Sequence, residues 1–239
     1  MFTGLVVNKL PVAAFDAHPR GARLAIDVSE HRFARPPAPG DSIAVAGVCL
    51  TVTEADATRL GFDVITETLN RTTLGRLEPG HRVNIEPSLA AGDALGGHFV
   101  QGHVDALGRV RRVVDDAAEY RITIEPESAP IAAAEREASV FPAPADVMDL
   151  VAPKGSIAVD GVSMTIASVT ATAFDIALIP TTLELTTLGE LAAGDRVNLE
   201  TDIIARSVVH YLRRQRQGGG DDGNTVDWDT LRGAGFVND

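Results

Sequence analysis

Hydrophobic and polar residues alternate along several short stretches of the chain, as they do in strands that bury one face. Clear examples are Leu24–Val28, Arg82–Glu86 and Tyr120–Glu125. Turn-forming residues separate such stretches, for instance at Ala38–Asp41 and Glu78–Gly80, where proline and glycine favour a reversal of the chain. The pattern predicts a protein built from short antiparallel strands.

The sequence also contains an internal repeat, which is the strongest indication of its architecture. Residues 42–51 (SIAVAGVCLT) match residues 156–165 (SIAVDGVSMT) at an offset of 114 positions. Residues 68–86 match residues 182–200 at the same offset. We interpret the chain as a tandem duplication followed by a tail.

The two copies match less closely where they begin. MFTGLV at 1–6 corresponds to FVQGHV at 99–104, at an offset of 98. The second copy therefore carries about sixteen extra residues, which we assign to the Pro/Ala-rich stretch 128–146 and interpret as a surface excursion. Because each copy is the size of a domain, we expect a first domain at 1–97 and a second at 98–201.

Each copy has room for about six short strands, and six antiparallel strands can close into a small barrel that exposes no strand edge. The predicted fold class is therefore all-β, with two tandem six-stranded antiparallel β-barrels from an internal repeat. Residues 68–77 and 182–191 have the pattern of short helical turns within the barrels.

The end of the chain has a different pattern. Its apolar residues recur at helical spacing: Ile204, Val208, Tyr211 and Leu212. Asp202 is suited to cap such a helix at its beginning. We expect a C-terminal α-helix over 202–217, followed by a flexible glycine-rich tail over 218–239.

Composition and charge narrow the possible functions. The net charge of −12 argues against non-specific nucleic-acid binding and against attachment to an anionic membrane surface. Cys49 is the single cysteine, so no internal disulfide can form, and the common zinc-ligand spacings do not occur. We find no signal peptide and no apolar run long enough to span a membrane, and we expect a cytoplasmic protein.

Residues that are equal in the two copies should do the same work in each. Gly47 and Gly161 precede matched strands, where glycine permits either a β-bulge or the close approach of another backbone or a ligand. Thr51 and Thr165 suit strands because they are β-branched, and their hydroxyl groups could instead hydrogen-bond a polar ligand.

Residues that differ between the copies should distinguish two sites. Cys49 corresponds to Ser163; a lone cysteine is usually a small buried residue, but serine at the same position favours a polar role. His103 corresponds to Leu5, and His98 lies five positions earlier in glycine-rich surroundings. If that stretch is a strand, the odd spacing puts the two histidines on opposite faces.

Several motifs together resemble one known family. MFTG, GVCLTV, ETLNRTTLG, GGHFVQGHVD, DGVSMT, LIPTTLELTTLG and VNLETD have the order and spacing seen in riboflavin synthases, enzymes with a duplicated lumazine-binding barrel. The resemblance runs from Met1 to about Leu212. Two departures lie beside the motifs, because Ala46 replaces the usual asparagine and Thr181 replaces a frequent histidine or glutamate.

The resemblance implies a transferase that catalyses the last step of riboflavin biosynthesis. It would move a four-carbon unit between two molecules of 6,7-dimethyl-8-ribityllumazine, giving riboflavin and 5-amino-6-(D-ribitylamino)uracil, with no cofactor and no metal. It also implies a homotrimer held partly by the C-terminal helices. The active site would form where the first barrel of one chain meets the second barrel of its neighbour. An association with lumazine synthase, which some relatives form, is left open.

The resemblance also assigns residues to the two sites. One substrate molecule would contact Gly4, Leu5, Val6, Ser163, Met164, Thr165, Ala177, Leu178, Ile179, Pro180 and Thr181. The other would contact Cys49, Leu50, Thr51, Asp63, Val64, Ile65, Thr66, Glu67, Thr68, Gly102, His103, Val104 and Lys154. The positions implied near the reaction are Phe2, Ser42, Cys49, His98, His103 and Asp202.

The implied reaction needs a base and a group that adds to the substrate, and the residue types at these positions can supply both. The C7 methyl group of the lumazine is acidic, and His103 is the natural base for its proton near neutral pH. The second molecule must be activated by addition at C7, for which Cys49, Ser42 or a water molecule is a candidate. Which residue is the base and which the nucleophile stays open at this point.

Two other function classes compete with the enzyme. The first is a non-catalytic lumazine or flavin carrier, which would keep the fold but lose parts of the second site. The second is the flavin domain of a reductase, which would need a nucleotide-binding domain, and no GxGxxG motif follows a strand here. The intact Cys49, His103, Lys154, Ser163 and Thr165 favour the enzyme.

Overall fold

The computed structural model describes residues 1–116, 119–127 and 147–217. The predicted excursion at 128–146 and the predicted tail at 218–239 lie outside these described residues. The described chain divides into a compact unit, Met1–Ile203, and a second unit that begins at Ile204.

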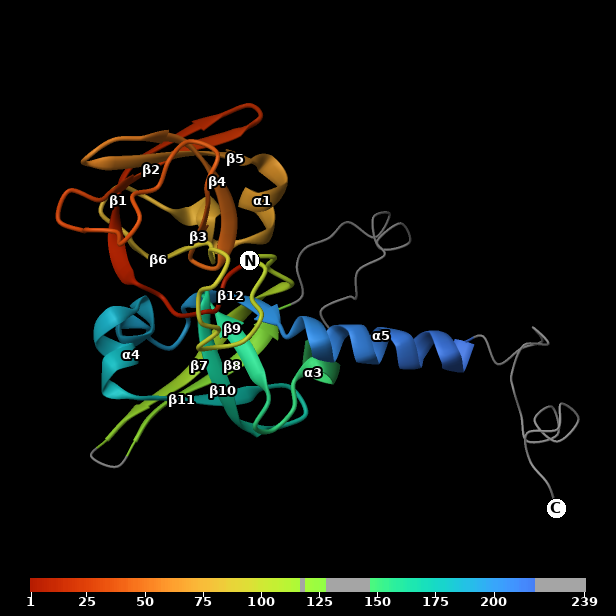
Figure 1. Ribbon diagram of the computed structural model, residues 1–239. Helices are drawn as coiled ribbons and strands as arrows, with labels where there is room; N and C mark the ends of the chain where they lie inside the picture. Colours follow the sequence, from red (N-terminus) through yellow and green to blue (C-terminus); the bar gives the residue numbers. More distant parts are fainter. Residues whose placement is uncertain (117–118, 128–146, 218–239) are drawn as a thin grey trace, which may run out of the picture. The chain divides into compact units, whose positions relative to one another are not determined.

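The first unit contains two closed six-stranded antiparallel barrels (Figure 1). The first barrel has the strands β1 (Asn8–His18), β2 (Gly21–Asp27), β3 (Ser42–Val45), β4 (Val48–Ala55), β5 (Arg59–Ile65) and β6 (Arg82–Pro87). The second has β7 (Ala106–Asp115), β8 (Tyr120–Glu127), β9 (Ser156–Val159), β10 (Val162–Val169), β11 (Phe174–Leu178) and β12 (Arg196–Thr201). Corresponding strands are paired in the same cyclic order, which confirms the predicted fold class.

Each barrel encloses its own hydrophobic core because alternate residues of every strand point inward. In β5, for example, Leu60, Phe62 and Val64 are buried, whereas the residues between them are more exposed. Phe174 and Ile176 of β11 occupy the equivalent layer of the second core. The period-two pattern of the sequence therefore selects the inward face of each strand.

Short helices follow β5 and β11, as predicted, but begin two residues earlier than the pattern suggested. They are α1 (Thr66–Arg71) with the 3-10 helix η1 (Thr73–Arg76), and α4 (Pro180–Leu185) with η3 (Thr187–Glu190). The side chains of Thr72 and Thr186 accept hydrogen bonds from the N–H groups of Leu74 and Leu188, and both leucines are buried. A further short helix, α3 (Val147–Leu150), precedes β9.

The helix α5 (Ile203–Gln217) confirms the predicted C-terminal helix. Its apolar residues fall on one face of the helix, at the spacing seen in the sequence: Ile204, Val208, Tyr211 and Leu212. In the part of the chain that the structure describes, no helix is long and apolar enough to cross a membrane.

The two barrels contact each other through the hairpins β3–β4 and β9–β10. Both hairpins turn on two residues with positive φ, Ala46 and Gly47 in the first and Asp160 and Gly161 in the second, as in type I′ turns. A Cβ atom on Gly47 would lie 2.5 Å from the backbone nitrogen of Gly161. Of the two predicted roles for these glycines, the structure therefore shows a tight turn with close backbone approach rather than a β-bulge.

Two buried asparagines at matched positions join the barrels reciprocally. The amide nitrogen of Asn84 donates to the Asp160 carbonyl (2.9 Å), and its oxygen accepts from the N–H of Thr187 (2.8 Å). Asn198 makes the equivalent bonds to the Ala46 carbonyl and the N–H of Thr73, both at 2.8 Å. Because buried amides need such partners, the exchange fixes the two barrels relative to each other.

Asp160 breaks this symmetry, because the matching residue in the first barrel is Ala46. The residue is only 7% exposed, and its Oδ1 accepts a hydrogen bond of 2.7 Å from the N–H of Asn198. Burial raises the pKa of Asp160 to about 7. The carboxyl group therefore holds its proton in the folded protein at pH values where the unfolded chain has lost it.

We predict that Asp160→Asn weakens the pH dependence of the free energy of unfolding. Since the folded pKa is the higher one, Asp160 stabilises the fold below about pH 4, and this contribution is lost as the pH rises through about 7. Asparagine keeps the acceptor oxygen and tolerates positive φ. Urea unfolding between pH 4 and 8 should show wild type losing more stability than the variant; equal slopes for both proteins would contradict this assignment.

Candidate functional site

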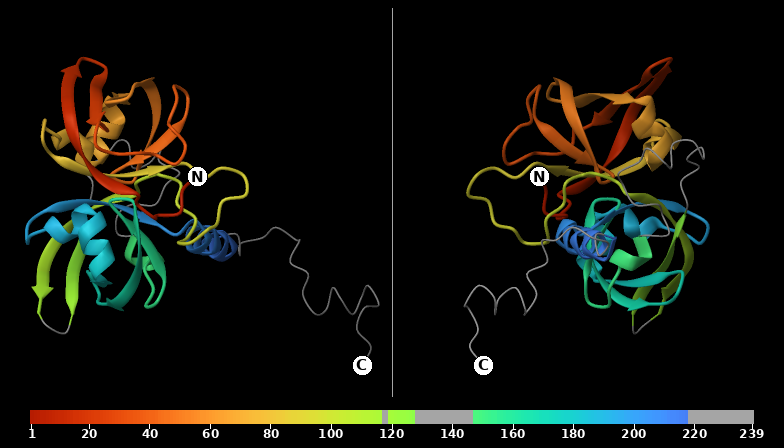
Figure 2. Two further views of the ribbon diagram at one scale, coloured as in Figure 1. Left: turned by 60° about the vertical axis from the view of Figure 1, so that its left-hand side comes forward. Right: turned by 90° about the vertical axis from the view of Figure 1, so that its right-hand side faces the viewer.

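Two chain segments cross between the barrels, one before β1 and one before β7. Phe2 of the first segment and Val100 of the second form an antiparallel bridge, with N–H to carbonyl distances of 2.7 and 3.1 Å. Both side chains are fully buried, in a small apolar cluster with Ala44 and Ala158 against which Cys49 packs. Both views of Figure 2 show the N-terminus at the junction of the two barrels.

The first segment completes the second barrel. The carbonyl of Gly4 accepts a hydrogen bond of 2.8 Å from the N–H of Ser163, at the start of β10. A Cβ atom on Gly4 would lie 2.5 Å from the Cβ of Ser163, so only glycine allows this approach. Two residues further on, Val6 packs against the core of the second barrel.

The second segment completes the first barrel in the same manner. The carbonyl of Gly102 accepts a hydrogen bond of 2.9 Å from the N–H of Cys49, and a Cβ atom there would lie 2.6 Å from the Cβ of Cys49. Val104 packs against the core of the first barrel. The two copies of the repeat have thus exchanged their leading segments.

Two buried carboxylates hold these segments in place. Glu86 at the end of β6 accepts from the N–H of Thr3 (2.7 Å), from its hydroxyl (2.8 Å) and from the N–H of Gly4 (3.0 Å). Glu200 on β12 accepts from three successive N–H groups, those of Gln101 (2.6 Å), Gly102 (2.9 Å) and His103 (3.0 Å). Each carboxylate therefore satisfies backbone donors of a segment that has no other regular structure.

The electrostatics of the two carboxylates are similar. Burial raises the pKa of Glu86, against the lowering effect of its hydrogen bonds to Thr3 and Gly4. Burial also raises the pKa of Glu200 to about 7, and the nearby charge of Asp105 adds to this effect. Our sequence reasoning missed both residues, although the matched endings VNIE and VNLE at the common offset could have indicated them.

Each barrel also presents one half-open strand edge. The N–H of Val52 bonds to the Asp41 carbonyl (2.9 Å), so by alternation the peptide groups of Thr51 point away from β3. The ladder between β4 and β5 ends at the Val52–Phe62 pair, which leaves Cys49–Thr51 opposite the end of β5. The bond from Ile166 to the Gly155 carbonyl gives Ser163–Thr165 the same orientation beside the end of β11.

The structure brings together most of the predicted substrate contacts in two clusters. The first-barrel cluster consists of Cys49–Thr51, Asp63–Thr68 and Gly102–Val104. The second-barrel cluster consists of Gly4–Val6, Ser163–Thr165 and Ala177–Thr181. Lys154, which we assigned to the first cluster, lies in the second barrel, where its N–H donates to the Ile166 carbonyl (2.8 Å).

The two histidines lie with different barrels. The Nδ1 of His98 is 2.7 Å from the hydroxyl of Ser163, whereas His103 follows Gly102 beside Cys49 and is exposed. Burial lowers the pKa of His98, and the charge of Asp202 opposes this shift. The Nε2 of His98 is buried and has no hydrogen-bond partner among the described residues. Residues 98–104 are not a strand, so the alternation of faces expected for His98 and His103 does not occur there.

The remaining predicted residues lie close to these clusters. Ser42 is paired in register with Thr51, although its carbonyl accepts from the N–H of Ser88 (3.1 Å) on the opposite side. Phe2 belongs to the buried bridge between the segments. Asp202 follows β12, two residues after Glu200.

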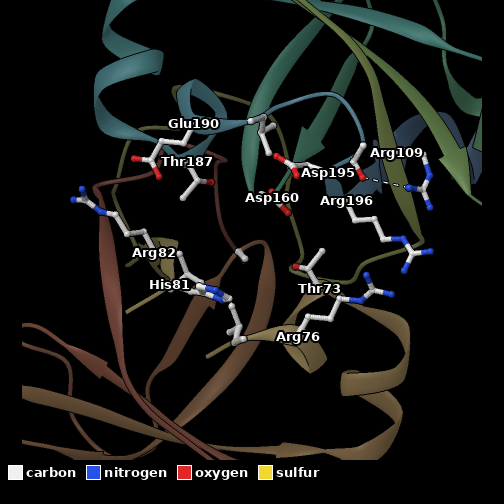
Figure 3. Close-up of a pocket in the computed structure, with 15 residues that line it drawn as sticks. Thr73, Arg76, His81, Arg82, Arg109, Asp160, Thr187, Glu190, Asp195 and Arg196 are labelled. Atoms are coloured by element: carbon white, nitrogen blue, oxygen red, sulfur yellow. Dashed lines mark hydrogen bonds between the residues drawn. The ribbon is translucent and has the colours of Figure 1, made fainter. Parts of the chain in front are cut away.

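A groove of about 630 Å³ lies elsewhere between the barrels (Figure 3). Its lining includes Arg76, Arg82, Arg109 and Arg196 but none of the predicted substrate contacts. Arg109 and Arg196 both pair with Glu127, which reduces the positive charge available to a ligand. The groove is therefore distinct from the two clusters.

Comparison with known proteins defines the class of this chain. The family model described as "Lumazine binding domain" matches twice, at residues 3–88 and 101–202, one match for each barrel. The structure of LumP complexed with 6,7-dimethyl-8-(1'-D-ribityl) lumazine has the same fold, with a TM-score of 0.66 and 23% identity over 84% of this chain and 99% of that one. The chain is thus a protein with two lumazine-binding domains.

Full-length relatives narrow the class further. Riboflavin synthase from Mycobacterium bovis is 43% identical over 89% of this chain and 98% of its own length. The riboflavin synthases of Chlamydia pneumoniae and Escherichia coli are 36% and 33% identical over 90% of this chain and 96% and 92% of their own lengths. The chain belongs to the riboflavin synthase family and is an enzyme of riboflavin biosynthesis.

We predict that Gly102→Ala is more damaging than Gly80→Ala. Both glycines have positive φ, which costs an alanine about 1–2 kcal/mol, but a Cβ atom on Gly80 would meet nothing within 4 Å. The added Cβ on Gly102 would force the segment away from Cys49. Urea unfolding and turnover should show a small loss of stability with normal activity for Gly80→Ala, and larger losses of both for Gly102→Ala; matching effects would contradict the close approach.

Proposed function

We propose that each barrel binds one molecule of 6,7-dimethyl-8-ribityllumazine and that a four-carbon unit passes between the two molecules. The observation that carries this proposal is the pair of equivalent strand edges, each completed by the exchanged segment of the other copy. Two similar edges suit two molecules of one substrate. The reaction balances without an oxidant or another reactant, because one molecule gains the four carbon atoms that the other loses.

The edges offer the polar and apolar groups that a flat heterocycle needs. The peptide groups near Thr51 and Thr165 that point away from β3 and β9 can hydrogen-bond the carbonyl groups and ring nitrogens of the lumazine. Leu5, Ile65 and Ile179 beside these edges are 52%, 62% and 65% exposed. They provide apolar surface for the faces of the rings.

The differences between the two clusters assign different roles to the two molecules. The first-barrel cluster contains Cys49 and His103, where the second has Ser163 and Leu5. We assign His103 as the base that takes a proton from the C7 methyl group. Cys49, with Ser42 close by, is then the polar group that assists addition at C7 of the acceptor molecule.

We also propose that the active site is shared between chains of a homotrimer. The contact expected between Lys154 and the first-barrel substrate cannot come from within the first barrel, because Lys154 lies in the second. A neighbouring chain that presents its second barrel would supply it. The apolar face of α5 is suited to hold such an assembly together.

We predict that the purified chain forms riboflavin from 6,7-dimethyl-8-ribityllumazine and that Cys49→Ser keeps substantial turnover. For Cys49→Ala we expect kcat to fall roughly 10²-fold, the usual effect of removing a polar group that stabilises developing charge. For Ser163→Ala we expect mainly a higher KM, because we assign Ser163 to substrate binding. Absorbance assays give both constants, and sedimentation of the same samples gives the number of chains.

Each outcome separates one competing account. Tight lumazine binding without riboflavin formation would indicate a carrier instead of an enzyme. Wild-type turnover by Cys49→Ala would make Cys49 a packing residue and leave water as the nucleophile. Full activity of a single chain would contradict the shared site.

A further inference from the structure

We propose that Glu86 and Glu200 are crossed positioning residues, each anchored in one barrel and fixing the substrate-binding edge of the other. The inference rests on the proposed function in one respect, namely that the two edges bind substrate. The positioning itself follows from the hydrogen bonds of the two carboxylates and can be tested without substrate.

Glu200 acts on the first barrel through a single residue. Its strand, β12, belongs to the second barrel, where Glu200 is in register with Ala158 of β9. The N–H of Gly102 donates to Glu200 (2.9 Å), and the carbonyl of Gly102 accepts from Cys49 on β4 of the first barrel (2.9 Å). The position of Cys49 relative to the second segment therefore depends on a carboxylate in the opposite barrel.

Glu86 repeats this arrangement in the reverse direction. It is in register with Ala44 of β3, within the first barrel. The N–H of Gly4 donates to Glu86 (3.0 Å), and the carbonyl of Gly4 accepts from Ser163 on β10 of the second barrel (2.8 Å). The two relays, Glu86–Gly4–Ser163 and Glu200–Gly102–Cys49, are related by the internal repeat.

A carboxylate suits this task because it accepts several hydrogen bonds at once and donates none when ionised. Glu200 takes three successive backbone N–H groups, and Glu86 takes two N–H groups and a hydroxyl. Above about pH 7, where Glu200 is ionised, it is a charged acceptor, and hydrogen bonds to a charged acceptor are about twice as strong as neutral ones. A glutamine would have the same shape but would turn an NH₂ group toward these donors.

Because each carboxylate lies in one barrel and acts on the edge of the other, a positioning role can be distinguished from a local structural role. If each carboxylate only stabilised its own barrel, its loss would disturb the strands of that barrel. Under the proposal, loss of Glu200 loosens the edge at Cys49 in the first barrel, and loss of Glu86 loosens the edge at Ser163 in the second. The Phe2–Val100 bridge is common to both segments, so it does not produce a difference between the two variants.

The single cysteine supplies a direct probe of the first edge. Cys49 can be alkylated with iodoacetamide, and the rate compared between wild type, Glu200→Gln and Glu86→Gln under native conditions. We expect Glu200→Gln to raise the rate at least about fivefold, the scale of one lost hydrogen bond, and Glu86→Gln to change it less than about twofold. The relevant rate is that of folded protein, so each variant is checked for a cooperative thermal transition.

The internal repeat supplies the matched control. In a Cys49→Ser, Ser163→Cys background the only thiol lies at the second edge, and the order of the two variants should reverse. Glu86→Gln should then raise the alkylation rate, and Glu200→Gln should not. Where a glutamine variant does not fold, the aspartate variant, one methylene shorter, gives the same comparison.

The results separate the inference from the proposed function. A crossed alkylation pattern supports the positioning role; equal increases at both edges, or an increase only within each carboxylate's own barrel, would overturn it. Riboflavin formation is then measured on the same variants, where we expect a loss of at least about tenfold in kcat/KM for each. Crossed alkylation with unchanged kcat/KM would retain the positioning role and contradict the substrate-binding role of the edges.

Discussion

The exchange of two short backbone segments between the barrels is the constraint on which the rest of the structure depends. Gly4 and Gly102 approach Ser163 and Cys49 so closely that no side chain fits between them. The segments are irregular, so their backbone donors need partners, and the buried carboxylates of Glu86 and Glu200 supply them. Each barrel is therefore complete only in the presence of the other.

The internal repeat makes much of the fold predictable from the sequence. Alternating residues indicate the strands. The constant offset of the repeat is enough to show that the hairpin turns at Gly47 and Gly161 occupy corresponding positions in the two copies. The crossing is harder to predict, because the contact from Gly4 to Ser163 joins parts of the chain whose local patterns say nothing about each other. Glu86 and Glu200 look like ordinary polar positions of alternating strands, although they are buried.

The histidines show a second limit of sequence reasoning. A period-two argument needs a regular strand, and the positive φ of Gly102 ends any such regularity before His103. His98 and His103 consequently lie beside different barrels. Lys154 was assigned to the first site on the resemblance alone, and within the chain it lies in the second barrel.

Some departures from the repeat lie where the two barrels and the two edges meet. Ala46 in the first hairpin corresponds to Asp160 in the second. The first-barrel cluster contains Cys49 and His103, whereas the second-barrel cluster has Ser163 and Leu5 at the corresponding positions. The backbone relays are nevertheless kept in both halves. One fold, used twice, therefore holds two similar molecules in similar positions while presenting different side chains to each.

The most direct test of this account is amide hydrogen exchange measured by NMR, with and without 6,7-dimethyl-8-ribityllumazine. The amides of Gly4 and Gly102 should be strongly protected in the free protein, because both donate to buried carboxylates. The amides of Thr51 and Thr165 should exchange faster and become protected when the ligand binds. Rapid exchange at Gly4 and Gly102, or ligand protection confined to residues outside the two clusters, would contradict the account.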